Sequence, residues 1–290
     1  MKRFSLLLAL LILIGLCGCV QADSDADIVA TTKPVYDFAL SLCDGTGLQV
    51  SLLISDSVSC LHDYTLSTTQ MRRLERADVI IANGAGLESF ADDVLKDRTN
   101  VVDSSIGVPL LESCHSHEEE HGHHHEADSH IWLSPTNCKI MCQNICLALV
   151  AQYPQHKTIF EQNLCSLLAK LDELQAYGES QLASLSSRKL ITFHDGFAYL
   201  ADAFDLEILS SIEEDDGSTI SAAKRIDLSQ LIEANHIPAI FIETNGYAGS
   251  AQSIANETGI RVFTLDTAMS EMDYFSAMRQ NINTLKGALG

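Results

Sequence analysis

Apolar positions along the chain switch between two spacings. Short apolar runs bounded by turn residues are typical of buried strands, whereas apolar residues that recur every three or four positions indicate helices. The short runs predict strands at Ile28–Thr31, Leu48–Ile54, Val79–Asn83, Asn100–Asp103, Leu190–Phe193, Ile208–Ser211, Ala239–Glu243 and Arg261–Leu265. The three-four spacing predicts helices between them at Pro34–Cys43, Ser67–Arg76, Leu87–Leu95, Phe197–Phe204, Leu228–Ala234, Ser250–Glu257 and Tyr274–Ala288. This alternation favours an α/β fold with mostly parallel sheets covered by helices.

The longest helical pattern lies between the two groups of strands. It begins near Pro154, keeps a three-four spacing up to Leu185 and is broken only near Gly178. A helix of about 30 residues spans roughly 45 Å, which is more than one small lobe needs. We therefore expect two lobes, each a four-stranded, mostly parallel sheet with flanking helices, joined by one long helix.

Two helix starts carry their own signals. Ser67 and Gln70 fit a capping box, in which each side chain bonds to the backbone of the other residue. Ser134 followed by Pro135 is typical of an N-cap with proline in the first turn. A histidine, His130, therefore lies just before the start of a predicted helix.

The N-terminal segment has the features of a targeting sequence. Lys2 and Arg3 precede an apolar stretch that ends in Leu16-Cys17-Gly18-Cys19. Leu-x-Gly-Cys resembles a bacterial lipobox, which implies cleavage before Cys19 and lipidation of its thiol. The alternatives are an ordinary signal peptide or a short membrane anchor. We expect a signal peptide at 1–18, an N-terminal lobe at 19–150 with a His-rich loop at 115–130, a linking helix at 151–187 and a C-terminal lobe at 188–290.

The composition is strongly acidic. The chain has 39 acidic residues against 18 basic ones, a formal net charge of −21. Such a surface disfavours nucleic acid and anionic lipid headgroups and raises the local concentration of cations. Cys138, Cys142 and Cys146 recur every four residues on one helical face, which is more typical of small buried hydrophobes than of metal ligands.

Four separated segments each offer one metal-ligating side chain near the end of a predicted strand or in a loop. These side chains are His62, His130, His194 and Asp266. Because open α/β sheets bind ligands at the carboxyl ends of their strands, we expect the four to meet in the cleft between the lobes. Three imidazoles and one carboxylate form a tetrahedral shell that suits Zn²⁺ better than Mg²⁺ or Ca²⁺. Water or Cys60, which would point to the same face as His62, could replace Asp266.

A histidine-rich tract lies between the first two of these segments. The stretch from His115 to His130 holds seven of the chain's 11 histidines. Its composition gives it metal affinity, so it could be an auxiliary metal-binding loop, a metal-sensing lid or a passive solvated loop. The auxiliary loop would use His115, His117, His121, His123, His124 and His125.

The order of these motifs resembles the zinc-uptake branch of the metal-binding solute-binding proteins of ABC transporters, the cluster A-I family. The similarity runs over nearly the whole chain beyond the N-terminal segment. The motifs that carry it are Ile28–Tyr36, His62-Asp63-Tyr64, Ala77–Glu88, the His tract, His130–Pro135, Phe193-His194-Asp195-Gly196-Phe197 and Thr264-Leu265-Asp266.

The resemblance implies a ligand set and a function. Position by position, the family's ligands fall on His62, His130, His194 and Asp266, and histidine at the third position marks the zinc branch, whereas manganese members use glutamate there. It implies an extracytoplasmic, lipid-anchored, monomeric receptor that captures Zn²⁺ for an ABC permease and its ATPase and is not an enzyme. The alternatives are a manganese or other divalent metal receptor, a surface adhesin and a zinc hydrolase. A catalytic zinc also needs a general base, and the sequence lacks His-Glu-x-x-His.

Overall fold

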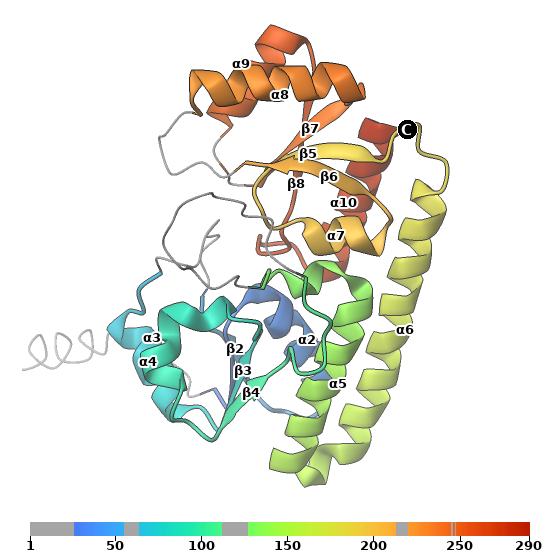
Figure 1. The fold of residues 1–290 in the computed structure, drawn as a ribbon. Helices are drawn as coiled ribbons and strands as arrows, with labels where there is room; N and C mark the ends of the chain where they lie inside the picture. Colours follow the sequence, from blue (N-terminus) through green and yellow to red (C-terminus); the bar gives the residue numbers. More distant parts are fainter. Residues whose placement is uncertain (1–25, 55–63, 112–126, 213–219, 245, 247) are drawn as a thin grey trace, which may run out of the picture.

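The computed structural model describes residues 26–54, 64–111, 127–212, 220–244, 246 and 248–290. These residues form two α/β lobes that lie beside one long helix (Figure 1). Each lobe contains a four-stranded sheet in which every strand pair is parallel. The prediction of two lobes with parallel four-stranded sheets is confirmed.

The N-terminal lobe has the strand order β2-β1-β3-β4. Its interior strands β1 and β3 are buried along their whole length, as their continuous apolar sequences predict. The strands are β1 (Ile28–Ala30), β2 (Val50–Leu52), β3 (Val79–Ala82) and β4 (Val101–Asp103). The helices are α2 (Lys33–Cys43), α3 (Thr68–Arg76), η1 (Leu87–Ala91), α4 (Asp92–Leu95), η2 (Ile131–Leu133) and α5 (Pro135–Gln152).

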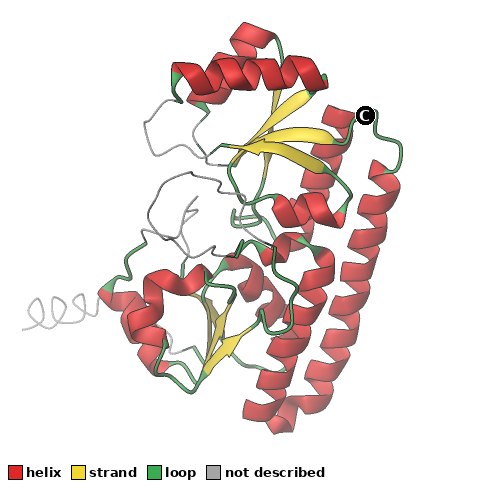
Figure 2. Ribbon diagram, viewed as in Figure 1, coloured by secondary structure: helices red, strands yellow, loops and turns green. Residues whose placement is uncertain are grey.

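The C-terminal lobe repeats this topology with the order β6-β5-β7-β8. Helices α8 and α9 cover one face of the sheet, and α7 and α10 lie on the other side (Figure 2). The strands are β5 (Lys189–Phe193), β6 (Glu207–Ser211), β7 (Ala239–Glu243) and β8 (Arg261–Leu265). The helices are α7 (Ala198–Ala203), α8 (Ala222–Asn235), α9 (Gly249–Thr258) and α10 (Tyr274–Leu289).

The long helix predicted between the lobes is α6 (Lys157–Leu182), which follows the short η3 (Pro154–His156) and has 26 residues. It packs against α2 and α5 of the first lobe and α10 of the second. The break in its apolar spacing has a physical reason, because a β-carbon at Gly178 would overlap the ring of Phe204, which follows α7. Gly178 therefore lets the helix approach the C-terminal lobe closely.

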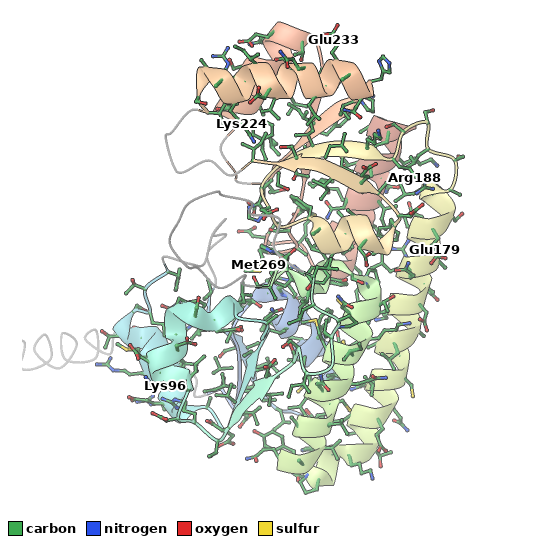
Figure 3. All side chains as sticks on the ribbon, in the orientation of Figure 1. Lys96, Glu179, Arg188, Lys224, Glu233 and Met269 are labelled. Atoms are coloured by element: carbon green, nitrogen blue, oxygen red, sulfur yellow. The ribbon has the colours of Figure 1, made fainter. Side chains whose placement is uncertain are left out.

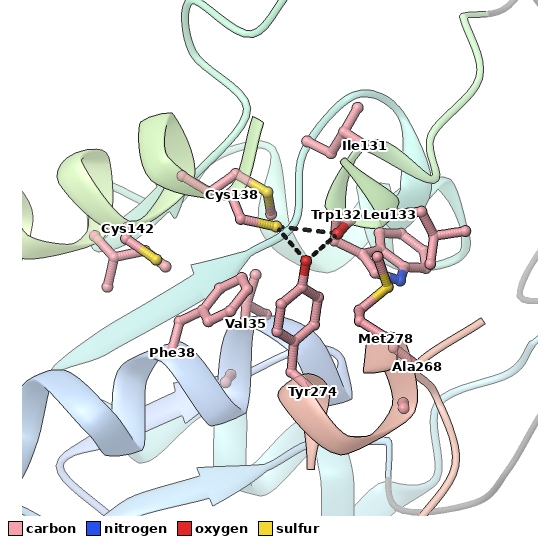
Figure 4. Close-up of a cluster of buried hydrophobic side chains, with 14 of the residues drawn as sticks. Val35, Phe38, Ile131, Trp132, Leu133, Cys138, Cys142, Ala268, Tyr274 and Met278 are labelled. Atoms are coloured by element: carbon pink, nitrogen blue, oxygen red, sulfur yellow. Dashed lines mark hydrogen bonds between the residues drawn. The ribbon is translucent and has the colours of Figure 1, made fainter. Parts of the chain in front are cut away.

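One apolar core runs from the N-terminal lobe into the contact between the lobes. At that contact Trp132 and Tyr274 are almost completely buried. The Trp132 indole Nε1 donates to the Thr267 carbonyl at 2.6 Å. The Tyr274 hydroxyl donates to the Trp132 carbonyl at 2.9 Å (Figure 4). The lobes are thus joined by directional hydrogen bonds as well as by apolar contact.

Apolar and charged side chains lie in different parts of the molecule. Met269 lies where the two lobes meet, while charged residues such as Lys96 and Glu233 are exposed on the outer surface (Figure 3). Cys138, Cys142 and Cys146 are buried, as their spacing on one helical face predicted. None of the described helices is long and apolar enough to cross a membrane.

Several element boundaries differ from the predictions. The predicted helix Leu87–Leu95 is the 3₁₀ helix η1 followed by the short α4, and α6 is shorter at both ends than the pattern from Pro154 to Leu185. Helix α8 begins at Ala222 rather than at Leu228, because the Ser221 hydroxyl accepts from the Lys224 N–H and caps an earlier start. Strand β2 is shorter than the apolar run Leu48–Ile54 that predicted it. The capping box of Ser67 and Gln70 is confirmed, with both reciprocal bonds formed.

Candidate metal centre

Two of the four predicted ligands meet between the lobes. His194 directly follows strand β5 of the C-terminal lobe, and His130 directly precedes η2 of the N-terminal lobe. Their Nε2 atoms are 3.2 Å apart, and the side chains are 12% and 19% exposed. Two nitrogens bound to one tetrahedral zinc at 2.0–2.1 Å lie roughly 3.3 Å from each other. The pair therefore has the spacing of two ligands of a single zinc ion.

Asp128 orients the ring of His130. Its Oδ1 accepts from the His130 backbone N–H at 2.9 Å and lies 2.8 Å from His130 Nδ1. A carboxylate accepts hydrogen bonds only, so this contact places the proton on Nδ1 and leaves a lone pair on Nε2, the atom that faces His194. A carboxylate behind a histidine in this way is a common support of metal-binding imidazoles.

Glu243 lies behind His194. It ends strand β7, the neighbour of β5 in the sheet, and its Oε2 is 3.6 Å from His194 Nδ1. Its other oxygen accepts from the Thr267 hydroxyl at 3.1 Å. Both histidines thus have a nearly buried carboxylate on the Nδ1 side and the partner imidazole on the Nε2 side.

Asp266 follows strand β8 and is 1% exposed. Its backbone N–H and C=O both bond to the Asn281 side chain of α10, and its Oδ1 accepts from the Ala268 N–H at 2.7 Å. Its Oδ2 is buried and has no hydrogen-bond partner among the described residues. Such an oxygen is costly to leave unpaired and could accept a cation.

The remaining predicted residues are not placed by the structure. His62, Cys60, Cys19 and the six histidines between 115 and 125 lie outside the described residues. Within the described part of the chain, no three His, Cys, Asp or Glu side chains form a group that could hold a metal ion. The structure therefore brings His130 and His194 together, but it does not group Asp266 with them.

Sequence reasoning missed the two supporting carboxylates. Asp128 had a local signal, because it stands two residues before His130. Glu243 had a weaker one, since it ends a predicted strand just as His194 follows another. The pairing of those two strands, β5 with β7, was not visible in the sequence.

The chain is similar to known zinc-uptake and zinc-binding proteins. A family model described as ZnuA, zinc-uptake complex component A periplasmic, matches residues 28–288. Zinc-binding lipoprotein AdcA of Streptococcus pneumoniae is 31% identical over 99% of this chain, which spans 61% of the length of that relative. High-affinity zinc uptake system protein ZnuA of Bacillus subtilis is 28% identical over 97% of this chain and 95% of its own length.

Solved structures resemble the fold over the same range. A crystal structure of ZnuA superposes with a TM-score of 0.80 at 29% identity, and it covers 91% of this chain and 99% of its own. A Zn(II)-bound structure of AdcA from Streptococcus pneumoniae gives a TM-score of 0.76 at 26% identity, over 91% of this chain and 57% of its own.

Proposed function

We propose a receptor function for this chain, which belongs to the ZnuA family of periplasmic zinc-uptake components. It captures Zn²⁺ outside the cytoplasm and delivers it to the permease of an ABC import system that an ATPase subunit drives. The observation that carries the proposal is the contact between His130 and His194, whose Nε2 atoms lie 3.2 Å apart at the junction of the lobes.

The complete site has four ligands in this proposal. His130 and His194 bind through Nε2, His62 supplies the third imidazole, and Asp266 supplies a carboxylate oxygen. The buried Oδ2 of Asp266, which has no hydrogen-bond partner among the described residues, supports its role. Cys60 and water are the competing fourth ligands. Ligands drawn from two lobes suit capture and release, so we infer a binding protein rather than an enzyme.

The surroundings of the site follow from the same proposal. The histidines between 115 and 125 serve as an auxiliary metal-binding loop. Cleavage before Cys19 and lipidation of its thiol hold the protein at the outer face of the cell membrane. The protein acts there as a monomer and delivers zinc to its permease. It has no nucleic-acid partner in this proposal.

Metal selectivity tests the function directly. Imidazole-rich sites favour zinc over manganese, so the tight site should keep zinc when both metals compete. Native mass spectrometry of the purified chain with equal concentrations of both metals measures which ion stays bound. Zinc should fill the first site and manganese should not displace it. Equal or tighter manganese binding would contradict the proposal.

A further inference from the structure

Tyr199 reaches from one lobe into the backbone that precedes His130. It lies on α7 of the C-terminal lobe and is 2% exposed. Its hydroxyl accepts from the Leu111 N–H at 2.9 Å and donates to the Asp128 carbonyl at 3.1 Å. Leu111 and Asp128 belong to the N-terminal lobe, and their backbones also bond to each other, from Asp128 N–H to Leu111 C=O at 3.0 Å.

Asp128, which Tyr199 contacts, is itself in direct contact with His130. The Asp128 carbonyl is held by Tyr199, and the Asp128 carboxylate accepts from the backbone and ring of His130. Burial raises the pKa of the Tyr199 hydroxyl, so it stays protonated and able to donate at neutral pH. Asp128 is nearly buried, so neighbouring atoms restrict the conformations of its side chain. A shift of its backbone therefore shifts its carboxylate as well.

We propose that Tyr199 is a positioning residue for zinc capture. From the C-terminal lobe it fixes the backbone of Asp128, and through the carboxylate of Asp128 it fixes the angle at which His130 faces His194. This inference rests on the proposed zinc-binding function. It adds a consequence, namely that the orientation of an N-terminal ligand depends on a side chain of the other lobe.

Replacing Tyr199 by phenylalanine tests this role, because the change removes the hydroxyl and keeps the ring. Outer-shell partners of metal ligands typically contribute about 10–100-fold in affinity, and Tyr199 acts through Asp128. Because Tyr199 lies one step further from the metal than Asp128, we expect Tyr199→Phe to weaken zinc about threefold, measured by competition with a chromophoric chelator at less than one equivalent of zinc. The visible absorption bands of the Co²⁺-loaded protein should also shift, since they report ligand geometry.

Tyr153→Phe is the matched control. Tyr153 is 8% exposed, and its hydroxyl bonds to the Asp27 carbonyl and the Asp78 carboxylate on the N-terminal lobe. It should lose stability to thermal unfolding but keep wild-type zinc affinity and the wild-type cobalt spectrum.

Two results would overturn the role of Tyr199. One is wild-type affinity and spectrum in Tyr199→Phe, and the other is an equal loss of zinc in both variants, which would indicate a general structural effect. If the unaltered protein bound no zinc tightly, the proposed function itself would fail, and that outcome is distinct from both.

Discussion

The two histidines that face each other are held in different ways. His194 is placed by a sheet, because it follows β5 directly and the residue behind it, Glu243, ends the neighbouring strand β7. His130 follows no strand and is placed by a loop. The backbone of that loop is fixed from the N-terminal lobe by Asn83, which donates to the Ser129 carbonyl at 3.1 Å, and from the C-terminal lobe by Tyr199.

The positions of His194 and His130 therefore depend on different kinds of interaction. A parallel sheet fixes the ends of adjacent strands through many backbone bonds, so the position of His194 survives the loss of one side-chain contact. The position of His130 depends on a few side-chain hydrogen bonds, each of which can be removed by one substitution. We therefore expect outer-shell substitutions near His130 to alter zinc binding more than equivalent ones near His194.

The largest effects on zinc affinity should come from replacing the histidines themselves, and here we expect no difference between His130 and His194. His130→Ala and His194→Ala each remove a proposed ligand and should lower zinc affinity by more than the roughly 10–100-fold caused by outer-shell changes. Weak binding by the histidine-rich tract should remain in both variants. Zinc titration with a competing chelator measures the loss.

Deleting residues 113–126 is the control for these variants, because it removes the six histidines between 115 and 125 and keeps Asp128 and Ser129, which the structure places against His130 and Asn83. The deletion should reduce the number of bound zinc ions seen by native mass spectrometry and leave one tight site. Loss of all tight binding in this deletion would move the site away from the two histidines.

Most of the fold was predictable because the strands coincide with short apolar runs and most of the longer helices carry apolar residues at a three-four spacing. The long helix was visible in the sequence, and so was the interruption of its apolar spacing at Gly178, although α6 itself is continuous there. His130 and His194 were predictable from their motifs. Tyr199 was not, since it lies 71 residues from Asp128 and 88 from Leu111, and no spacing rule connects residues so far apart.

The fourth ligand offers the next largest effect and compares the two lobes directly. Asp266 belongs to the C-terminal lobe, whereas Cys60 precedes His62 in the N-terminal half of the chain. Asp266→Ala should weaken zinc about 100-fold, or about 2.8 kcal/mol, because the buried carboxylate is the proposed ligand. Cys60→Ser should leave the affinity nearly unchanged. Zinc titrations of both variants under reducing conditions give the ranking, and the reverse order would assign the fourth position to Cys60.

The smallest expected effects on zinc affinity concern the carboxylates behind the two histidines. They test most directly whether His130 depends on side-chain contacts more than His194 does. Asp128→Asn and Glu243→Gln both keep the shape of the side chain and remove its charge. Hydrogen bonds to charged groups contribute about 1 kcal/mol more than neutral ones, so Asp128→Asn should weaken zinc about fivefold. Glu243→Gln should change affinity by about twofold or less, because its 3.6 Å separation from His194 Nδ1 is too long for a direct hydrogen bond.

Chelator competition on the two variants in parallel measures this difference, and the cobalt spectrum of each reports whether the ligand geometry moves. A larger loss in Glu243→Gln than in Asp128→Asn would reverse the comparison. It would mean that the sheet alone does not hold His194, and that Glu243 supports this histidine as closely as Asp128 supports His130. Equal losses would mean that both histidines depend on their carboxylates alike, so that strand β5 contributes no more to zinc binding than the loop before η2.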